Sequence, residues 1–418
     1  MRGKRLSIGL RLTLAIFIVT LLVTGTAFSQ ETVLHSFNDN GTDGFSPWGG
    51  LIFDKAGNLY GTTVDGGPNG SGVVFELAPN GGGNWTETVL HNFGSGTDGT
   101  FPYGTLIFDA SGNLYGTTEF GGVDGYGTVF EMTPKAKGVW KEKVLYDFDA
   151  GNGKDAGGPL AGVIFDGSGN LYGTSELGGV YSSGTVFELT AKAGGGWKEK
   201  VLHSFNPNGK DGNFPNAGLA VDKSGKLFGT TLEGGVSGLG TVFEVAPKAG
   251  GGWEETVLHS FNSSGTDGYL PFAGLIFDGS GNLYGATSVG GNQSGGIVFE
   301  LTPKAGGKWK EKILYNFAYA IGSDPFGNLL FDGSGNLYGT TGSGGTFTYG
   351  TVFELTLQKN GKWTETVLHN FDDDGTDGYD PHPALIFDVS GNLYGTTYSG
   401  GTSTSCTGGC GTVFEIKP

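Results

Sequence analysis

The stretch Gly-Asn-Leu-Tyr-Gly-Thr-Thr at residues 57–63 recurs seven times, in close variants, along this 418-residue chain. Its aromatic residue returns every 54 to 57 residues, at Tyr60, Tyr115, Tyr172, Phe228, Tyr284, Tyr338 and Tyr394. A fixed period of this length is typical of a repeat architecture, in which each repeat is one supersecondary unit. The sequence therefore predicts seven copies of one structural unit.

Three further phrases recur around each aromatic: Leu-Ile-Phe-Asp before it, Gly-Thr-Val-Phe-Glu after it, and then Trp-x-Glu-x-Val-Leu-His-x-Phe. In the first repeat they predict strands at 51–54, 59–63, 73–77 and 87–93. Val, Phe, Leu and Thr bounded by Gly, Asn and Pro favour β-structure, and no helical apolar stripe is present. Four antiparallel strands per repeat predict an all-β fold, a seven-bladed β-propeller.

The repeats are out of frame with the ends of the propeller segment. Residues 31–37 carry the last phrase, whereas residues 411–416 carry the third, so the seventh unit lacks its outermost strand. We expect the N-terminal strand to complete the last blade by pairing with residues 413–416, which protects two sheet edges. A parallel β-helix is the alternative, but an open solenoid gains nothing from this offset and needs distinct capping repeats.

Residues 1–29 have the pattern of a signal peptide, which leaves residues 30–418 as the propeller. Three arginines and a lysine within residues 2–11 precede an apolar run at 12–23, and Ala27 and Ser29 are small residues at a signal-peptidase site. An uncleaved membrane anchor is the alternative. No second apolar run follows, so we expect a secreted, extracytoplasmic protein without a membrane span in its mature part.

The charge composition excludes some partners. The chain has 24 basic and 41 acidic residues, and four basic ones, including every arginine, lie within residues 2–11. The mature part therefore keeps 20 basic residues and no arginine. Nucleic-acid binding depends on Lys and Arg that neutralise phosphates, and arginine supplies the fork that grips them. We expect no nucleic-acid partner, and a monomer that its negative charge keeps soluble.

The phrases Gly-Asn-Leu-Tyr-Gly-Thr-Thr and Gly-Thr-Val-Phe-Glu-Leu resemble the Gloeo-Verruco (GloVer) tandem repeat of exported bacterial proteins. The resemblance covers residues 31–418, and its loosest copy is Lys226-Leu227-Phe228 in the fourth repeat. The Asp-x-x-Gly-Asn-Leu-Tyr hairpin is also similar to NHL-type and regulator-type propeller repeats, which implies the strand order above. The family carries no established activity that the resemblance implies for this chain.

Histidines and carboxylates recur at fixed positions in the repeat. One position of the outermost strand holds His or Tyr in every unit: His35, His91, Tyr146, His203, His259, Tyr315 and His369. A position shared by these two residue types indicates a packing site with a polar tip. Asp54 and Glu76 also have counterparts in all seven units, and acids that recur around a whole ring mark the fold, whereas glycoside hydrolysis needs an isolated pair. We expect no catalytic residue, metal site or cofactor.

The two cysteines, Cys406 and Cys410, lie close together in the last repeat. In an exported protein such a pair favours a local disulfide. Two free thiols are the alternative.

The crossover between repeats varies at one position. The pattern Gly-x-Asp-Gly-x-x-Pro ends just before the innermost strand, and the residue after its proline is Trp48, Tyr103, Leu160, Asn216, Phe272, Phe326 or His382. A constant scaffold with a varied rim is how repeat proteins build binding faces. We therefore expect a binding site at one channel mouth, formed by Trp48, Tyr103, Phe272, Phe326 and His382 together with Asp43, Asp98 and Asp377. Aromatics wedged between blades are the alternative.

No serine triad, HExxH zinc motif, phosphate loop or dinucleotide fingerprint occurs. A non-catalytic binding or scaffold role is favoured, with a neutral glycan or a partner protein on the crossover face, although the sequence leaves enzymatic activity open. The alternatives are a carbohydrate-active hydrolase or lyase at the channel mouth and a structural surface or matrix protein. Acids and histidines that break the sevenfold pattern in the channel favour the enzyme, whereas exposed rim aromatics favour binding.

Overall fold

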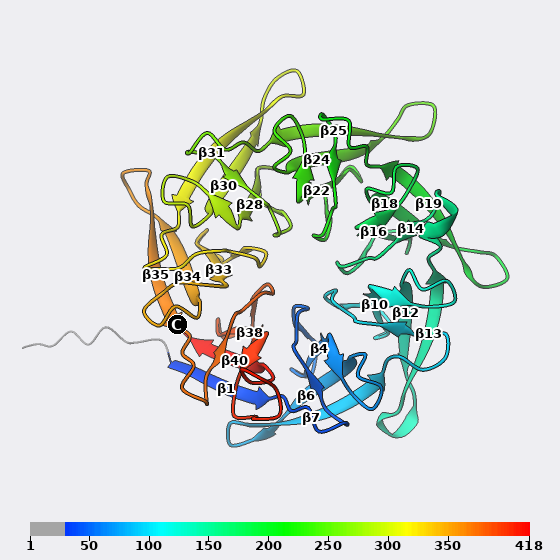
Figure 1. The fold of residues 1–418 in the computed structure, drawn as a ribbon, viewed down its shortest axis with the longest axis vertical. Coiled ribbons are helices and arrows are strands. Elements are labelled where there is room, and N and C mark those ends of the chain that lie inside the picture. The colour runs from blue at the N-terminus through cyan, green and yellow to red at the C-terminus, as the bar shows by residue number, and fades with distance from the viewer. Residues whose placement is uncertain (1–29) are drawn as a thin grey trace, which may run out of the picture.

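A computed structural model describes residues 30–418, which form a closed ring of seven four-stranded antiparallel sheets (Figure 1). The prediction of an all-β, seven-bladed propeller is confirmed. Residues 1–29, with the signal peptide expected there, lie outside the described residues. The only helices in residues 30–418 are two 3₁₀ turns, Ala136–Gly138 (η1) and Ala150–Asn152 (η2). Within that range no helix is long and apolar enough to span a bilayer.

The four strands of each blade follow one another in order from the ring axis to the outer edge. The innermost strands are β3 (Ile52–Phe53), β9 (Ile107–Phe108), β15 (Ile164–Phe165), β21 (Ala220–Val221), β27 (Ile276–Phe277), β32 (Leu330–Phe331) and β37 (Ile386–Phe387). The second strands are β4 (Leu59–Thr63), β10 (Leu114–Thr118), β16 (Leu171–Ser175), β22 (Leu227–Thr231), β28 (Leu283–Thr287), β33 (Leu337–Thr341) and β38 (Leu393–Thr397). The third strands are β6 (Val73–Gly81), β12 (Thr128–Pro134), β18 (Thr185–Ala191), β24 (Thr241–Pro247), β30 (Ile297–Pro303), β34 (Thr351–Leu357) and β40 (Thr412–Lys417). The outermost strands are β7 (Asn84–Asn92), β13 (Trp140–Asp147), β19 (Trp197–Ser204), β25 (Trp253–Ser260), β31 (Trp309–Asn316), β35 (Trp363–Asn370) and β1 (Gln30–Ser36).

Short ladders in the crossovers were not predicted. They pair β2 (Gly44–Phe45) with β5 (Asp65–Gly66), β8 (Gly99–Thr100) with β11 (Phe120–Gly121), β14 (Ala156–Gly157) with β17 (Leu177–Gly178), β20 (Gly212–Asn213) with β23 (Glu233–Gly234), β26 (Gly268–Tyr269) with β29 (Val289–Gly290), and β36 (Gly378–Tyr379) with β39 (Ser399–Gly400). In the sixth blade a single bridge between Ser323 and Ser343 takes their place. Each ladder ties the crossover to the loop that follows the second strand of the same blade.

The recurring Asp-x-x-Gly-Asn-Leu-Tyr phrase is the turn between the first two strands. In the first blade Asp54 Oδ1 accepts hydrogen bonds from the backbone N–H of Ala56 (2.8 Å) and Asn58 (2.9 Å), and Oδ2 accepts one from the Asn58 side chain (2.9 Å). Gly57 has φ +89°, a conformation that only glycine adopts without strain. The repeated aspartates are therefore turn residues, as expected.

The ring closes through its two ends. Strand β1 pairs with β40 from Gln30 opposite Lys417 to Ser36 opposite Thr412, with a bulge between Val33 and His35 (Figure 1). Strand β40 pairs in turn with β38, so the N-terminal segment supplies the outermost strand of the last blade. The predicted closure is confirmed.

Hydrophobic clusters fill the spaces between neighbouring blades. One cluster joins Val74 and Phe93 of the first blade to Leu114 and Phe130 of the second, and the two phenyl rings lie 5.1 Å apart, edge to face. At the closure, Phe37 takes the place of Phe93 and packs 5.1 Å from Phe75. Because each cluster contains residues of two blades, every blade is stabilised by packing against both of its neighbours.

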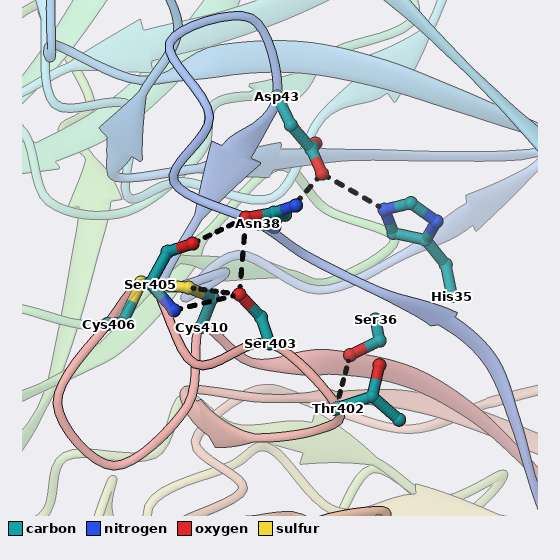
Figure 2. Close-up of a disulfide and its surroundings, with 9 residues drawn as sticks. All are labelled: His35, Ser36, Asn38, Asp43, Thr402, Ser403, Ser405, Cys406 and Cys410. Carbon is teal, nitrogen blue, oxygen red and sulfur yellow. Dashed lines mark hydrogen bonds and ion pairs between the residues drawn. A yellow bond between two sulfur atoms is a disulfide. The ribbon is translucent and has the colours of Figure 1, made fainter.

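The structure joins Cys406 and Cys410 in a disulfide with a Cα–Cα distance of 5.2 Å. The loop that carries the bond lies against the N-terminal segment, as Figure 2 shows. Ser405 Oγ donates a hydrogen bond to Asn38 Oδ1 at 2.8 Å, and the Thr402 N–H donates one to Ser36 Oγ at 2.8 Å. The disulfide loop therefore braces the closing blade from outside the sheet.

Reduction of this disulfide is expected to change global stability little. The bond closes a loop of only a few residues, so its entropic contribution is at most about 2 kcal/mol. The melting temperature should fall by a few degrees or less on adding reductant or in the Cys406→Ser/Cys410→Ser variant, while proteolysis within residues 402–411 becomes faster. A collapse of the melting temperature would contradict this local role.

Candidate binding site at the channel mouth

Each crossover delivers one side chain to the mouth of the central channel. In the first blade the Ser46 N–H donates to Cys410 O of the last blade (2.9 Å), and the Ser46 carbonyl accepts from the Val64 N–H (3.1 Å). Backbone contacts on both sides thus fix Pro47 and Trp48. The residue before this proline has positive φ in all seven blades. It is glycine only in the third blade (Gly158), and the other six are Ser46, Phe101, Phe214, Leu270, Asp324 and Asp380. Such backbone strain concentrates at functional sites.

Five consecutive blades place rings side by side at this mouth. The Trp48 ring stacks on His382 with centroids 4.0 Å apart and 19° between planes, and Tyr103 lies edge-on to Trp48 at 5.5 Å. On the other side of His382 follow Phe326, at 4.9 Å, and then Phe272, 5.1 Å from Phe326. We call Trp48, Tyr103, Phe272, Phe326 and His382 the aromatic arc. Ring geometry gathers all five, as the sequence predicts.

The remaining two positions, Leu160 and Asn216, complete the circle opposite the arc. All seven side chains border two cavities, one of about 250 Å³ that also touches Glu119 and one of about 380 Å³ lined further by the innermost strands. The seven residues therefore form the boundary between an outer and an inner chamber. Chambers of this size are typical of small-ligand sites.

Glycine and alanine line the inner chamber because the blades approach closely near the axis. A Cβ on Gly162 would lie within 3.0 Å of the backbone oxygen of Thr105 in the preceding blade, and one on Gly104 would meet Gly162 at 2.6 Å. Hydrogen bonds cross between blades here, including Gly50 N–H to Thr105 Oγ1 at 2.8 Å. The chamber walls are therefore mostly backbone, and the arc supplies the large side chains.

Two residues that line the chambers carry polar atoms without partners among the described residues. Asn216 Oδ1 and His382 Nδ1 are buried and have no hydrogen-bond partner within residues 30–418. The other nitrogen of His382, Nε2, lies 3.1 Å from Asp380 Oδ1. Buried polar groups are almost always hydrogen-bonded in folded proteins. The two unpartnered atoms are therefore suited to a ligand that offers hydroxyl groups.

One acidic residue, Glu119, lines the outer chamber, and its charged neighbour is Glu176. Burial, followed by the charge of Glu176, raises the pKa of Glu119 to about 7. Burial also raises the pKa of Glu176 above its ordinary value. Burial, and then the charges of Glu119 and Asp65, raise the pKa of Tyr103 to about 12. None of the residues that line the two chambers is Lys or Arg. The mouth therefore disfavours anions.

The arc does not belong to the packing between blades. None of its five residues is part of the seven hydrophobic clusters that the described residues form. The wedge alternative required the opposite arrangement. Each arc side chain is half-buried, and its ring contacts are with other residues of the mouth, such as Tyr398 at 5.6 Å from Trp48.

The structure does not bring Asp43, Asp98 and Asp377 to the mouth, so that part of the site prediction is wrong. Their carboxylates point to the outer edge of the ring, where Asp98 Oδ2 lies 2.8 Å from His91 Nε2 and Asp377 Oδ2 lies 2.9 Å from His369 Nε2. Asp43 Oδ2 accepts a hydrogen bond from the Asn38 N–H at 3.0 Å. These aspartates precede the crossover ladder, four residues before the proline, and the chain turns inward only after them.

A second set of residues at the mouth was not predicted from the sequence. They come from the loop after the second strand, which holds Val64, Glu119, Glu176, Leu232, Ser288, Gly342 and Tyr398 at equivalent positions. The sequence does contain a signal for these residues. Their position varies from repeat to repeat, although it directly follows the nearly constant Gly-Thr-Thr phrase. Glu119 and Tyr398 reach the arc because the crossover ladders hold this loop beside it.

The Gloeobacter/Verrucomicrobia repeat family model matches this sequence at residues 15–218, 142–317 and 307–418. The chain belongs to this family. No curated protein matches the sequence.

Among solved structures, a candidate 6-phosphogluconolactonase from Bacteroides uniformis aligns with a TM-score of 0.50 and 13% identity, over 83% of this chain and 88% of its own. A candidate oxidoreductase (glucose dehydrogenase) from Thermus thermophilus aligns with a TM-score of 0.45 and 17% identity, over 93% and 100%. At these identities the likeness concerns the propeller fold alone, and function has to be argued from the site.

Proposed function

We propose that this repeat protein is an exported, non-catalytic binding propeller whose channel mouth holds a neutral carbohydrate. The observation that carries the proposal is the aromatic arc, five rings in contact across five neighbouring blades. Sugars have apolar faces formed by C–H groups, which pack on flat rings, and hydroxyl groups around their edges. The rings of the arc match the apolar faces, and the unpartnered polar atoms of His382, within the arc, and of Asn216, opposite it, match the hydroxyl groups. Export rests on the signal-peptide pattern of residues 1–29.

Charge and size favour this ligand class over others. The lining lacks Lys and Arg, and Glu119 and Glu176 lie close to the chamber, so a phosphorylated or sulfated ligand would meet repulsion. Chambers of about 250 and 380 Å³ suit one or two sugar rings rather than a folded partner protein. A chain end of a neutral polysaccharide fits both constraints.

The Trp48→Ala variant is expected to bind neutral oligosaccharides at least about 30-fold more weakly, because a buried tryptophan anchor contributes roughly 2 kcal/mol or more. Titration calorimetry on a panel of neutral and acidic oligosaccharides checks this. Trp48→Phe keeps a flat ring and should retain most of the affinity. The melting temperature should be nearly the same in all three proteins, because Trp48 lies outside the hydrophobic clusters.

Two outcomes would replace the proposal. A large loss of stability in Trp48→Ala would make the tryptophan a structural wedge. Release of products from a bound oligosaccharide, abolished in Glu119→Gln, would instead identify a hydrolase or lyase. Glu119 is the residue that favours this second candidate, since a carboxyl group with a pKa of about 7 suits general acid catalysis.

A further inference from the structure

A second kind of polar cluster lies on the outer edge of the ring, between neighbouring blades. Each cluster combines a histidine of one outermost strand, an aspartate of the crossover that follows it, and a glutamate of the next outermost strand. The five clusters are His35–Asp43–Glu87, His91–Asp98–Glu142, His203–Asp211–Glu255, His259–Asp267–Glu311 and His369–Asp377–Glu31. In each of them the three potential ligand atoms lie within 4.8 Å of one another.

The cluster around His259 has the spacing of a metal site. His259 Nε2 lies 3.3 Å from Asp267 Oδ2 and 3.6 Å from Glu311 Oε1. Tetrahedral ligands at zinc bond lengths of about 2.0–2.2 Å are themselves roughly 3.3–3.6 Å apart. The three side chains are only 19%, 6% and 17% exposed. Neither His259 Nε2 nor Glu311 Oε1 has a hydrogen-bond partner among the described residues.

The cluster around His35 repeats this arrangement, and its histidine and aspartate are drawn in Figure 2. His35 Nε2 lies 3.5 Å from Asp43 Oδ2, and the Asp43 side chain is 9% exposed. Three atoms here lack a hydrogen-bond partner: His35 Nε2, Asp43 Oδ1 and Glu87 Oε1. Two buried carboxylates beside each other without a cation are costly, because their charges repel in a medium of low dielectric constant.

The other three clusters have the same ligand set with shorter contacts. His91, His203 and His369 are hydrogen-bonded through Nε2 to their aspartates at 2.8–3.0 Å, and a metal ion would replace the proton of that hydrogen bond. In each, the glutamate from the next blade keeps a buried oxygen without a partner, on Glu142, Glu255 and Glu31 respectively. An unpartnered glutamate oxygen thus recurs in all five clusters, and it is also present on Glu199 and Glu365 at the two junctions that carry tyrosine, so what sets the five clusters apart is the imidazole.

Tyrosine replaces histidine at two junctions, and only the Tyr146 junction keeps both carboxylates, because Ile321 stands in place of the crossover aspartate at the Tyr315 junction. Tyr146 donates a hydrogen bond to Asp155 Oδ2 at 2.9 Å, and Tyr315 donates one to Glu365 Oε2 at 2.8 Å. A neutral phenol satisfies a carboxylate without offering an imidazole ligand. The fold therefore accepts either residue at this position.

We propose that the five His–Asp–Glu clusters bind divalent transition-metal ions of the Zn²⁺ type, one ion per cluster, with side chains of two neighbouring blades as ligands. Zn²⁺ is commonly bound by neutral imidazole nitrogens and carboxylate oxygens, which are the ligands that each cluster offers. A water molecule would complete the tetrahedral coordination. Their two negative charges balance the dication, which removes the repulsion between the buried carboxylates. The ions link the outermost strands of adjacent blades.

The test is a metal titration of the full-length mature protein after treatment with a chelator. Equilibrium dialysis against Zn²⁺, read by elemental analysis, should give five ions per chain. His259→Tyr, which copies the native junction at Tyr146, should give four, and Tyr146→His, which places an imidazole beside Asp155 and Glu199, should give six. Circular dichroism should show the same fold in all three proteins.

Stoichiometry decides the outcome. Substitution with Co²⁺ should also produce visible d–d absorption that decreases by one fifth in His259→Tyr. Absence of bound Zn²⁺ at a free concentration of about 10 µM would overturn the proposal, since protein zinc sites bind far more tightly. An ion count that is the same in the wild type, His259→Tyr and Tyr146→His would overturn it as well.

Discussion

Deletion of residues 30–38 is expected to destabilise the whole propeller far beyond the effect of an ordinary point mutation. Strand β1 pairs with β40 along its length, and Phe37 is completely buried against Phe75. The truncation exposes the edge of β40 and opens the cluster that joins the last blade to the first. Point mutations typically cost about 0.5–3 kcal/mol, and we expect a larger loss here. Guanidinium unfolding, followed by circular dichroism, measures it.

Two variants calibrate that result. Phe37→Ala leaves the strand in place and removes only one buried ring, which should cost about 3–5 kcal/mol. Val389→Ala alters a fully exposed hairpin residue and should leave the unfolding midpoint unchanged. A truncated protein that unfolds at the midpoint of the intact one would contradict closure by β1.

The Gly173→Val variant is expected to destabilise the third blade through overpacking. The second-strand glycine faces the phenylalanine of the third strand, and a Cβ on Gly173 would lie 2.5 Å from Cζ of Phe187. Gly173 lacks a positive φ, so the effect is purely one of space. Overpacking in a tight core costs typically 1–3 kcal/mol and occasionally more, and thermal unfolding reports it.

Gly167→Ala is the matched control in the same blade. No heavy atom lies within 4 Å of a Cβ built on Gly167, and its φ is not positive, so its melting temperature should equal that of the wild type. Restoration of stability in Gly173→Val by Phe187→Leu would confirm the pair as the cause. Equal stability of Gly173→Val and the wild type would show that the blade can relax around the clash.

The fold could be predicted because the sequence features that determine each blade recur seven times. The Asp–Gly–Asn turn at Asp54, the glycine under Phe75 and the offset of residues 31–37 each have a local physical cause that the sequence displays. Strand bounds were less accurate. The first innermost strand is only Ile52–Phe53, because Asp54 leaves the ladder to bind its turn. Strands β6 and β7 extend beyond the predicted 73–77 and 87–93 toward each other and meet in a tight hairpin.

The site was predictable only in part, because periodicity shows positions and not the direction of side chains. Trp48 and its counterparts could be placed, since they adjoin the innermost strands. Asp43 lies five residues earlier, on the far side of a short ladder that no strong strand pattern announces, and it faces outward. Glu119 was missed because its approach to the arc depends on that ladder.

The outer clusters were invisible for a different reason. Each one assembles residues from two neighbouring blades, such as His259 with Glu311, which are about one repeat apart in sequence. A single repeat indicates only a packing role for the histidine. The structure confirms that role, because the His259 ring lies edge-on to Phe261 at 4.7 Å. The glutamate comes close to the histidine only because the closed ring places neighbouring blades side by side.

A crystal structure of the protein soaked with the neutral oligosaccharide that binds it best would locate the binding site. We expect a sugar ring in the chamber bounded by the aromatic arc, in van der Waals contact with Trp48 and with a hydroxyl group at hydrogen-bonding distance from Asn216 Oδ1 or His382 Nδ1. A sugar ordered elsewhere on the propeller, with only solvent at the channel mouth, would contradict it.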